Sequence, residues 1–361
     1  MIYIVPIEPI DTRYTRQWYD HIPKLLDARG ADVTIIEGDD VPAAPTPGAF
    51  LDFGATNIYK SSQLMIIAQM FREGKIQDGD KFLYTDAWNP TVIQLRYMAE
   101  LLGKKIEIHG MWHAGSYDPQ DFLGRLIGDT PWVRNAEYSM FHCYDYNWFA
   151  TRFHVNMFAR NLLDIEALFE EDEAEALMYA YPGVRITGWP MEYMKDVMAP
   201  FQRTPKKNKI IFPHRIAPEK QVDIFRDLAA TMPEYEWVVA QDQQLTKDEY
   251  HQHLAESRVV FSANLQETLG ISMYEGALLG AYPLVPDRLS YTEMWEGGCR
   301  YPSSWTKDWN SYQQHKDLLV DYIRKLMDGN GLEETAISRS MDVGRRFFDS
   351  APMLDILTET A

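Results

Sequence analysis

The sequence predicts an α/β protein with two doubly wound, Rossmann-like domains. Short apolar runs rich in Val and Ile alternate with stretches of helical periodicity along almost the whole chain. The 361 residues are enough for two domains, each with its own hydrophobic core. A polar stretch at residues 192–209 contains Pro200 and Pro205 and interrupts the alternation, as an interdomain linker does.

The first domain is predicted over residues 1–195. Its strands are expected within residues 1–7, 31–38, 80–90, 104–115, 136–144 and 185–191. Its helices are expected within residues 15–30, 49–76, 91–103, 118–128 and 147–163, with a strand at the start of the 49–76 stretch and an exposed Pro/Ala loop over residues 42–47. The loop after the first strand lacks the Gly-rich turn of a dinucleotide fingerprint, which argues against a Rossmann dehydrogenase.

The second domain is predicted over residues 210–336, after a linker at residues 196–209. Its clearest part is a parallel βαβ unit at residues 259–286, where a β-branched strand gives way to helical spacing from Thr268. Gly280 stands where a glycine ends a helix, and a strand resumes at Tyr282. Further elements are a strand from residue 210, helices at 221–233, 246–258 and 311–329, a strand at 235–242, and a helix beginning within 290–298.

The composition is that of a soluble globular protein, with 46% apolar and 24% charged residues. No apolar run approaches the ~20 residues of a membrane span, and the first residues lack the features of a signal peptide, so we expect a cytoplasmic protein. Cys143 and Cys299 are far apart and are expected to be free thiols. The net charge of −18 disfavours nonspecific attachment to DNA or anionic membranes across the whole surface, but it leaves room for a local basic groove.

Two segments of the second domain carry charged residues at spacings that suit a nucleotide sugar. Glu267 and Glu275 are eight residues apart around a predicted helix N-terminus, so both can face one crevice. The unpaired N–H groups at that N-terminus, near Leu269 and Gly270, suit a diphosphate. Upstream, Arg215 and Lys220 are five residues apart after a predicted strand, where two cations would neutralise a departing diphosphate.

Together, these segments resemble the second domain of retaining glycosyltransferases with the GT-B fold, of the family 4-like type. That family has an E-x7-E motif, matched by Glu267 and Glu275, and an Arg and Lys five residues apart, matched by Arg215 and Lys220. The resemblance implies two Rossmann-like domains facing a central cleft, with a last helix, here residues 337–361, crossing back to the first domain. It also implies that Glu275 binds the ribose, that Glu267 contacts the donor sugar, and that Arg215 and Lys220 hold the diphosphate. Relatives usually have Gly before the Arg, where this chain has His214.

Candidate residues of the first domain lie at or just past predicted strand ends, where α/β sheets place ligands. By the resemblance, a His near the donor sugar is expected, and His113 is the best match, with His109 second. Asp86 and Asp118 are candidates for the acceptor side, Asp86 as a base, although both also fit as cap or turn residues. The remaining candidates for an acceptor surface are Arg13, Tyr14, Arg16 and Trp88, which also fit a solvated helix face and core aromatics.

These features predict transfer of a sugar, with retention of configuration, from a nucleoside diphosphate sugar to an acceptor hydroxyl. A UDP-sugar is the expected donor, with no other cofactor and no metal ion, because the sequence lacks the D-x-D of metal-dependent glycosyltransferases and any Cys/His cluster. Residues 1–23, 83–90 and 109–125 also resemble glycosyltransferases encoded by large tailed phages, some of which modify hydroxymethylated bases in their own DNA. This resemblance implies a DNA acceptor. A saccharide or small metabolite acceptor, a GT-B sugar-nucleotide 2-epimerase and a catalytically silent binding protein are the alternatives.

Overall fold

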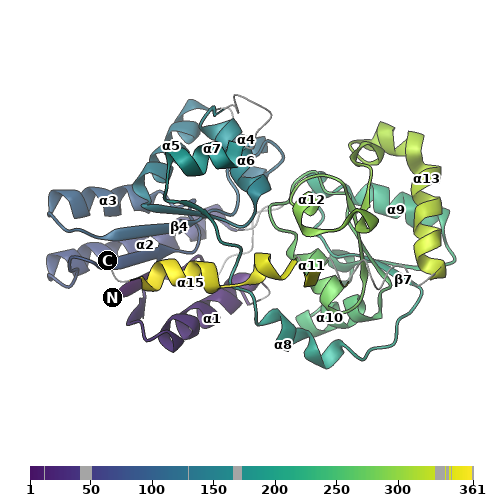
Figure 1. Ribbon diagram of the computed structural model, residues 1–361, viewed down its shortest axis with the longest axis horizontal. Helices are drawn as coiled ribbons and strands as arrows, with labels where there is room; N and C mark the ends of the chain where they lie inside the picture. The colour runs from purple at the N-terminus through teal and green to yellow at the C-terminus, as the bar shows by residue number, and fades with distance from the viewer. Residues whose placement is uncertain are drawn as a thin grey trace. The chain divides into compact units, whose positions relative to one another are not determined.

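Parallel strands alternate with helices throughout the computed structural model, and they form two separate sheets (Figure 1). The structure describes residues 1–11, 13–40, 51–128, 130–165, 173–329, 338, 341–342 and 344–359. Contacts divide the chain into unit 1, Met1–Pro190 with Asp349–Ala361, and unit 2, Met191–Phe348. The expected loop at residues 42–47 lies outside the described residues, as does part of the expected C-terminal helix.

Unit 1 is built on a six-stranded parallel sheet with the strand order β2-β1-β3-β4-β5-β6. Its strands are β1 Ile2–Val5, β2 Val33–Ile35, β3 Lys81–Tyr84, β4 Glu107–Met111, β5 Tyr146–Phe149 and β6 Val184–Ile186. Its helices include α1 Tyr14–Ala28, α2 Phe53–Arg72, α3 Thr91–Leu101, α4 Phe122–Ile127, α5 Pro131–Cys143, α6 Arg152–Leu162, α7 Glu173–Ala180 and α15 Ala351–Thr358. All four residues of β1 are buried, as expected for a parallel strand that helices cover on both faces.

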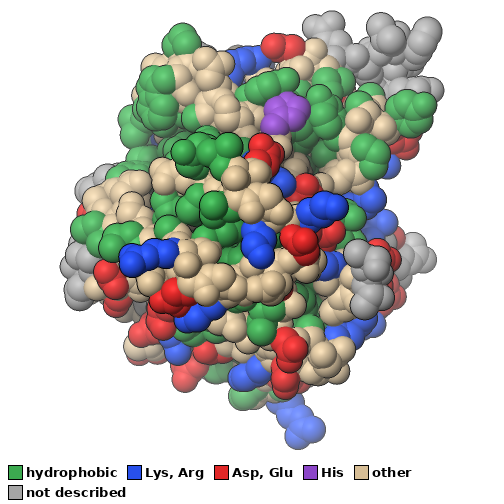
Figure 2. Space-filling view, turned by 90° about the vertical axis from the view of Figure 1, so that its left-hand side faces the viewer, with side chains coloured by type: hydrophobic (Ala, Val, Ile, Leu, Met, Phe, Trp, Pro, Cys, Tyr) green, Lys and Arg blue, Asp and Glu red, His purple; other side chains and the backbone are tan. Residues whose placement is uncertain are grey.

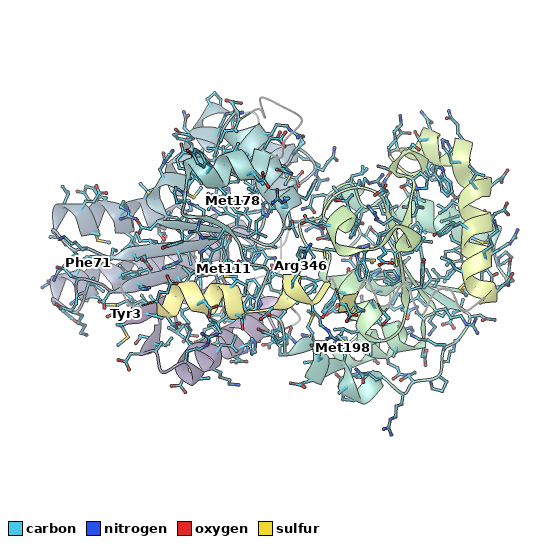
Figure 3. The ribbon with its side chains drawn as sticks, viewed as in Figure 1. Tyr3, Phe71, Met111, Met178, Met198 and Arg346 are labelled. Atoms are coloured by element: carbon cyan, nitrogen blue, oxygen red, sulfur yellow. The ribbon has the colours of Figure 1, made fainter. Side chains whose placement is uncertain are left out.

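The C-terminal helix α15 packs beside α1 within unit 1 (Figure 1). Arg29 donates to Asp355 at 2.9 Å, and the Lys81 ammonium donates to the carbonyl of Ile356 at 3.3 Å. The core of this unit is aromatic and aliphatic, and Figure 3 labels Tyr3, Phe71 and Met111 among its buried side chains. At the end of the molecule that faces the viewer in Figure 2, acidic, basic and hydrophobic side chains are interspersed.

Unit 2 is built on a five-stranded parallel sheet with the strand order β11-β10-β9-β7-β8. Its strands are β7 Lys209–Phe212, β8 Glu236–Val239, β9 Val259–Phe261, β10 Tyr282–Pro286 and β11 Arg300–Tyr301. Its helices include α8 Met194–Met198, α9 Val222–Thr231, α10 Lys247–Glu256, α11 Ile271–Leu278, α12 Tyr291–Met294 and α13 Trp309–Asp328. Its short 3-10 helices are η1 Ala199–Phe201, η2 Pro218–Lys220, η3 Ala240–Gln243, η4 Gly297–Cys299, η5 Ser303–Trp305 and η6 Arg345–Phe348.

The predicted βαβ unit is confirmed, since Tyr282 of β10 pairs with Val259 of β9 in a parallel ladder. Gly280 follows the end of α11 with a φ of 75°, as a helix-ending glycine does. The helix itself begins at Ile271, later than the expected Thr268. Glu267 therefore lies in the loop before the helix, and Glu275 lies on it.

Two strand predictions were wrong. The strand expected at the start of the 49–76 stretch is not found in its described part, because residues 51–52 are not in a strand and helix α2 begins at Phe53. Residues 136–143, which were also expected as a strand, belong to helix α5, and the strand β5 follows at Tyr146–Phe149, inside a stretch expected to be helical. Pro131 occupies the first turn of α5, and its buried residues Val133, Glu137, Met140 and Phe141 recur at helical spacing. An aromatic-rich segment resembles a strand by composition, but burial at intervals of three and four residues decides in favour of the helix. Among the helices of the described residues, none has the length and apolar character needed to span a bilayer.

Candidate active site

The candidate site of unit 2 lies where the strand order of its sheet reverses. β7 is the first strand of this sheet along the chain, with β8 on one side and β9 on the other. The chain leaves the carboxyl ends of β7 and β9 toward opposite sides, and ligands of open α/β sheets bind at this kind of switch point. Both motifs singled out in the sequence begin at these two strand ends: the β7 loop, residues 213–221, and the β9 loop, residues 262–270.

The β7 loop contains Arg215 and Lys220 and is shaped by the 3-10 helix η2. Pro218 begins η2, and Gln221 ends it in the left-handed conformation with a φ of 53°. The Arg215 guanidinium donates to the Glu219 carboxylate at 2.5 Å. Glu219 and Lys220 are both buried, whereas 30% of the Arg215 side chain is exposed. Glu219, the neighbour of Lys220 in the sequence, is thus paired with Arg215.

Contacts between the two loops bring Lys220 to Glu267. The Lys220 ammonium donates to the carbonyl of Gln266 at 2.6 Å and lies 3.5 Å from the Glu267 carboxylate. The amide of Leu265 donates to the carbonyl of Glu219 at 2.8 Å. Two residues that are far apart in the sequence are thus held together at the carboxyl ends of β7 and β9.

The carbonyl groups of the β9 loop are held by side chains from later in the chain. Arg288 donates to the carbonyls of Asn264 at 2.7 Å and Ala263 at 2.8 Å, and Tyr301 donates to the carbonyl of Ser262 at 2.7 Å. Sequence reasoning missed Arg288 and Tyr301. Arg288 follows directly after strand β10, so its place at a strand end was the available signal.

The N-terminus of α11 follows this loop, and Gly270 makes it possible. Gly270 has a φ of 80°, and a Cβ added there would lie 2.9 Å from the Tyr291 ring. Only glycine satisfies both the backbone conformation and the space. The N-cap residue is this glycine, which has no side chain to cap the first N–H groups of α11. Leu269 is buried and contributes to this N-terminus through its backbone alone.

Glu275 faces helix α10 from the middle of α11. The Tyr250 hydroxyl donates to its carboxylate at 3.1 Å. Burial raises the pKa of Glu275 to about 7, and the Tyr250 hydrogen bond and the charge of Lys247 offset part of that rise. Near neutral pH this carboxyl group therefore exchanges between its acid and its carboxylate form, and both forms can hydrogen-bond a hydroxyl group.

His214 is the residue that replaces the usual glycine before Arg215. It is buried, and burial, with the charges of Lys220 and Arg215, holds its pKa well below the ordinary value. Its ring is therefore neutral. Asn264 lies 3.5 Å from its Nδ1 and also contacts the Tyr291 hydroxyl at 3.1 Å.

In unit 1, His113 and Tyr14 come together at the equivalent sheet edge. The Tyr14 hydroxyl lies 2.8 Å from Nδ1 of His113, and Nε2 of His113 lies 2.5 Å from the carbonyl of Thr85. Because a carbonyl only accepts, Nε2 carries the proton and Nδ1 accepts from Tyr14. Burial lowers the pKa of His113, although the nearby Asp86 raises it in part. The imidazole is thus a neutral ring in which both nitrogens are hydrogen-bonded, one to Tyr14 and one to Thr85.

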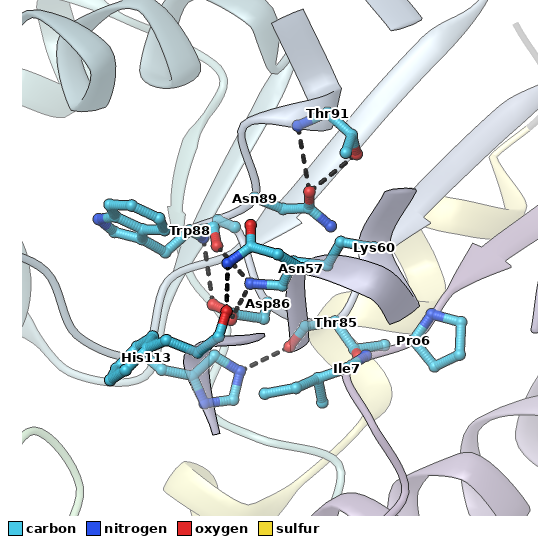
Figure 4. A network of polar contacts seen from close by, with 12 residues as sticks. Pro6, Ile7, Asn57, Lys60, Thr85, Asp86, Trp88, Asn89, Thr91 and His113 are labelled. Atoms are coloured by element: carbon cyan, nitrogen blue, oxygen red, sulfur yellow. Dashed lines mark hydrogen bonds and ion pairs between the residues drawn. The ribbon is translucent and has the colours of Figure 1, made fainter. Parts of the chain in front are cut away.

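Asp86 and Trp88 follow β3 and belong to a second polar network of unit 1 (Figure 4). Lys60 lies 3.7 Å from the Asp86 carboxylate and donates to the carbonyl of Trp88 at 2.9 Å. The indole N–H of Trp88 donates to Glu137 at 2.7 Å, and the same carboxylate accepts from the amide of Ser116 at 2.6 Å. Sequence reasoning missed Lys60 and Glu137, which lie within helices α2 and α5 and not in the loops that follow the strands.

The other candidates of unit 1 have contacts within their own segments. Arg16 lies 3.5 Å from Asp20 on its own helix, and the amide of Arg13 donates to the carbonyl of Ile10. Asp118 is buried and accepts from the amide of Gln120 at 2.9 Å, as a turn residue does. His109 lies inside β4, fully buried and 2.7 Å from Glu107.

Comparison with known proteins places the fold. No protein-family model matches the chain, and no curated protein matches its sequence. Sucrose-phosphate synthase from Thermosynechococcus elongatus is similar in structure over 99% of this chain and 96% of its own, with a TM-score of 0.61 at 10% identity. The chain has the GT-B fold.

Another GT-B glycosyltransferase, the pneumococcal O-GlcNAc transferase GtfA in complex with UDP and GlcNAc, is similar over 83% of this chain. Its TM-score is 0.52 and its identity is 13%, and the chain covers 59% of that protein. A UDP-GlcNAc 2-epimerase from Neisseria meningitidis has a TM-score of 0.39, which is too low to bear on the function of this GT-B protein.

Proposed function

We propose that this GT-B protein is a retaining glycosyltransferase whose unit 2 binds a nucleoside diphosphate sugar. The observation that supports it is the convergence of Lys220 and Glu267, 3.5 Å apart, beside Arg215 and the uncapped N-terminus of α11. Cations and a helix N-terminus at the carboxyl ends of two strands suit a diphosphate. A half-buried carboxyl group on the same helix suits ribose hydroxyls, which is the role proposed for Glu275.

In the proposed reaction, the bond from the anomeric carbon to the diphosphate oxygen breaks first. Arg215, Lys220 and the N–H groups near Leu269 and Gly270 would stabilise the negative charge that grows on the leaving diphosphate. The acceptor hydroxyl then attacks the oxocarbenium-like sugar from the face that the diphosphate leaves. Glu267 would stabilise the positive charge on the sugar. Retention of configuration rests on the family resemblance.

The donor is proposed to be a UDP-sugar, with no further cofactor. The GtfA structure, which has the same fold, holds UDP and GlcNAc, and this supports the choice of base without fixing it. His113, which the resemblance matches to the His near the donor sugar, would contribute as a fixed neutral ring whose two nitrogens already bind Tyr14 and Thr85. Asp86 is the proposed acceptor base.

The acceptor is proposed to be a hydroxymethylated base in DNA, with a saccharide or small metabolite as the second candidate. Trp88 supports a ring-shaped acceptor, because the hydrogen bond of its indole to Glu137 holds an aromatic surface in one orientation. The net charge of −18 weighs against extended contact with a DNA backbone and favours contact with a single extruded nucleotide.

Release of nucleoside diphosphate tests the function directly. UDP-, GDP- and ADP-sugars would be supplied with and without duplex DNA containing 5-hydroxymethylcytosine. We expect release from the UDP-sugar that depends on the modified DNA. Release that ignores DNA would move the acceptor to saccharides or metabolites, and turnover of the sugar without any acceptor would favour the 2-epimerase reaction.

The Glu275→Ala variant tests the site. The variant should raise the donor KM at least ~10-fold or abolish turnover, because it removes the group proposed to bind the ribose. Glu249→Ala, which removes an exposed carboxylate from the neighbouring helix α10, is the control and should keep wild-type kinetics. Unchanged kinetics in Glu275→Ala would contradict the assignment of the site.

A further inference from the structure

Glu219 is a buried carboxylate next to the proposed diphosphate site. Its side chain is 0% exposed, and it accepts a hydrogen bond from Arg215 at 2.5 Å. A carboxylate beside a diphosphate repels it, so charge alone would disfavour this residue here. For Glu219 to favour donor binding, another interaction of this carboxylate has to outweigh its repulsion of the diphosphate.

That effect is found in the partners of Arg215. Among the described residues, Glu219 is the partner of every hydrogen bond and ion pair that the Arg215 side chain makes. The Nε atom of Arg215 is buried and has no hydrogen-bond partner in the described part of the chain. Without Glu219, the long Arg215 side chain would lose every hydrogen bond and ion pair that it makes to the described residues, and with them the polar anchor of its rotamer.

The backbone around Glu219 is itself held firmly against the β9 loop. The carbonyl of Glu219 accepts from the amide of Leu265 at 2.8 Å, and Lys220 donates to the carbonyl of Gln266 at 2.6 Å. The Gln221 side chain donates to the carbonyl of Ala263 at 2.6 Å. Three consecutive residues thus each contact the β9 loop, so the Glu219 carboxylate is presented from a rigid segment.

We propose that Glu219 is a positioning residue that orients Arg215 for the diphosphate of the donor. This inference rests on the proposed function and deepens it. A guanidinium held in place beforehand loses little rotamer freedom when the diphosphate binds, and its remaining N–H groups stay directed toward the ligand. Orientation favours binding and the charge of Glu219 opposes it, so the two effects predict opposite results when the charge is removed.

Calorimetric titration of the full chain with nucleoside diphosphates separates these effects. UDP, GDP and ADP are tested first, and the diphosphate that binds is then compared with its own nucleoside, which lacks the phosphates. Glu219→Gln should weaken diphosphate binding about tenfold or more, since Arg215 loses its anchor, and should leave nucleoside binding unchanged. The control variant Glu234→Gln removes an exposed carboxylate that lies 3.3 Å from Arg324 in the same unit. It should change neither diphosphate binding nor nucleoside binding.

A double mutant tests whether Glu219 acts through Arg215. Arg215→Met should weaken diphosphate binding by itself, and adding Glu219→Gln to it should cause no further loss. Glu219→Asp keeps the charge but shortens the reach to Arg215, so it should also weaken diphosphate binding. Glu219→Asp carries the test if melting shows that Glu219→Gln is unfolded.

Three other outcomes would contradict the proposal. Diphosphate binding by Glu219→Gln that equals or exceeds wild type would overturn the positioning role, because the lost repulsion would then outweigh orientation. Equal loss of diphosphate and nucleoside binding would also overturn it, since Glu219 would then support the loop as a whole. If the wild-type chain binds none of the three diphosphates, the proposed function itself fails.

Discussion

Glu275 shows at the residue scale how a group proposed to bind the donor can oppose the stability of the fold. Its pKa of about 7 in the folded protein lies above the ordinary value of 4.5, because burial disfavours the ionised form. Ionisation therefore destabilises the fold. This destabilisation is absent below about pH 4.5 and grows as the pH rises through 7.

Glu275→Gln should consequently stabilise the protein in a pH-dependent way. We expect its free energy of unfolding to exceed that of wild type by about 1–2 kcal/mol at pH 8, with allowance for the partial exposure of the side chain, and to match wild type at pH 4. Urea unfolding at both pH values measures the difference. Equal stabilisation at pH 4 and pH 8 would show that packing, and not ionisation, is responsible.

Glu137 in unit 1 is a buried carboxylate that stabilises the fold, because it connects the loops that follow β3 and β4. It is fully buried, and its carboxylate accepts from Trp88 in one loop and from the amide and hydroxyl of Ser116 in the other. Glu137→Ala should leave these buried donors without their acceptor and lower the free energy of unfolding by about 3 kcal/mol.

Chemical denaturation measures this loss against a matched exposed carboxylate. Glu175 lies 3.4 Å from Arg152 with 65% of its side chain exposed, so Glu175→Ala should cost no more than about 0.5 kcal/mol. Similar effects of the two variants would argue that the network around Glu137 contributes nothing beyond a surface ion pair.

At the scale of elements, the loop before α11 depends on Gly270. Gly270→Ala should cost about 2–4 kcal/mol, because it combines a φ of 80° with a Cβ placed 2.9 Å from the Tyr291 ring. It should also weaken donor binding, since the N-terminus of α11 has to move. Thermal melting and nucleotide titration measure the two effects.

Gly30 provides the comparison for that prediction. Its φ is 75°, but a Cβ added there meets nothing within 4 Å. Gly30→Ala should therefore cost about 1 kcal/mol from backbone strain alone and leave nucleotide binding intact. If Gly270→Ala costs no more than Gly30→Ala, the close contact with Tyr291 does not constrain the loop.

At the scale of the whole molecule, buried neutral histidines in both units should make the protein sensitive to acid. His154 of unit 1 has a pKa of about 3 and His251 of unit 2 a pKa of about 4, and burial is the main cause of both shifts. Each folded-state value lies below the ordinary 6.5, so the unfolded chain takes up protons first. Stability is full above about pH 6.5 and falls as the pH drops toward 4.

His251→Leu should reduce this acid sensitivity in unit 2. His251 is 1% exposed, and neither of its ring nitrogens has a hydrogen-bond partner in the described part of the chain. The difference in free energy of unfolding between the variant and wild type should shift in favour of the variant by on the order of 3 kcal/mol when the pH is lowered from 7.5 to 4. Urea unfolding across this range tests it, and a constant difference between variant and wild type would exclude His251 as the titrating group.

The sequence alone determined the parallel α/β class and the βαβ unit at residues 259–286, because these depend on local periodicity and turn chemistry. It failed at residues 136–144, where an aromatic-rich helix resembles a strand until the buried positions are known. The spacing of Arg215 and Lys220 could also be read directly, because it is a property of the sequence itself.

Only the tertiary structure decided which groups surround these residues. Glu219 became the buried partner of Arg215, and Arg288 and Tyr301 proved to hold the β9 loop, through contacts between segments that the sequence keeps far apart. In unit 1, Glu137 was hidden within an amphipathic helix and became visible as the support of Trp88 only in three dimensions. Periodicity reports which face of an element is buried, whereas the partner on that face depends on how the sheet and its loops assemble.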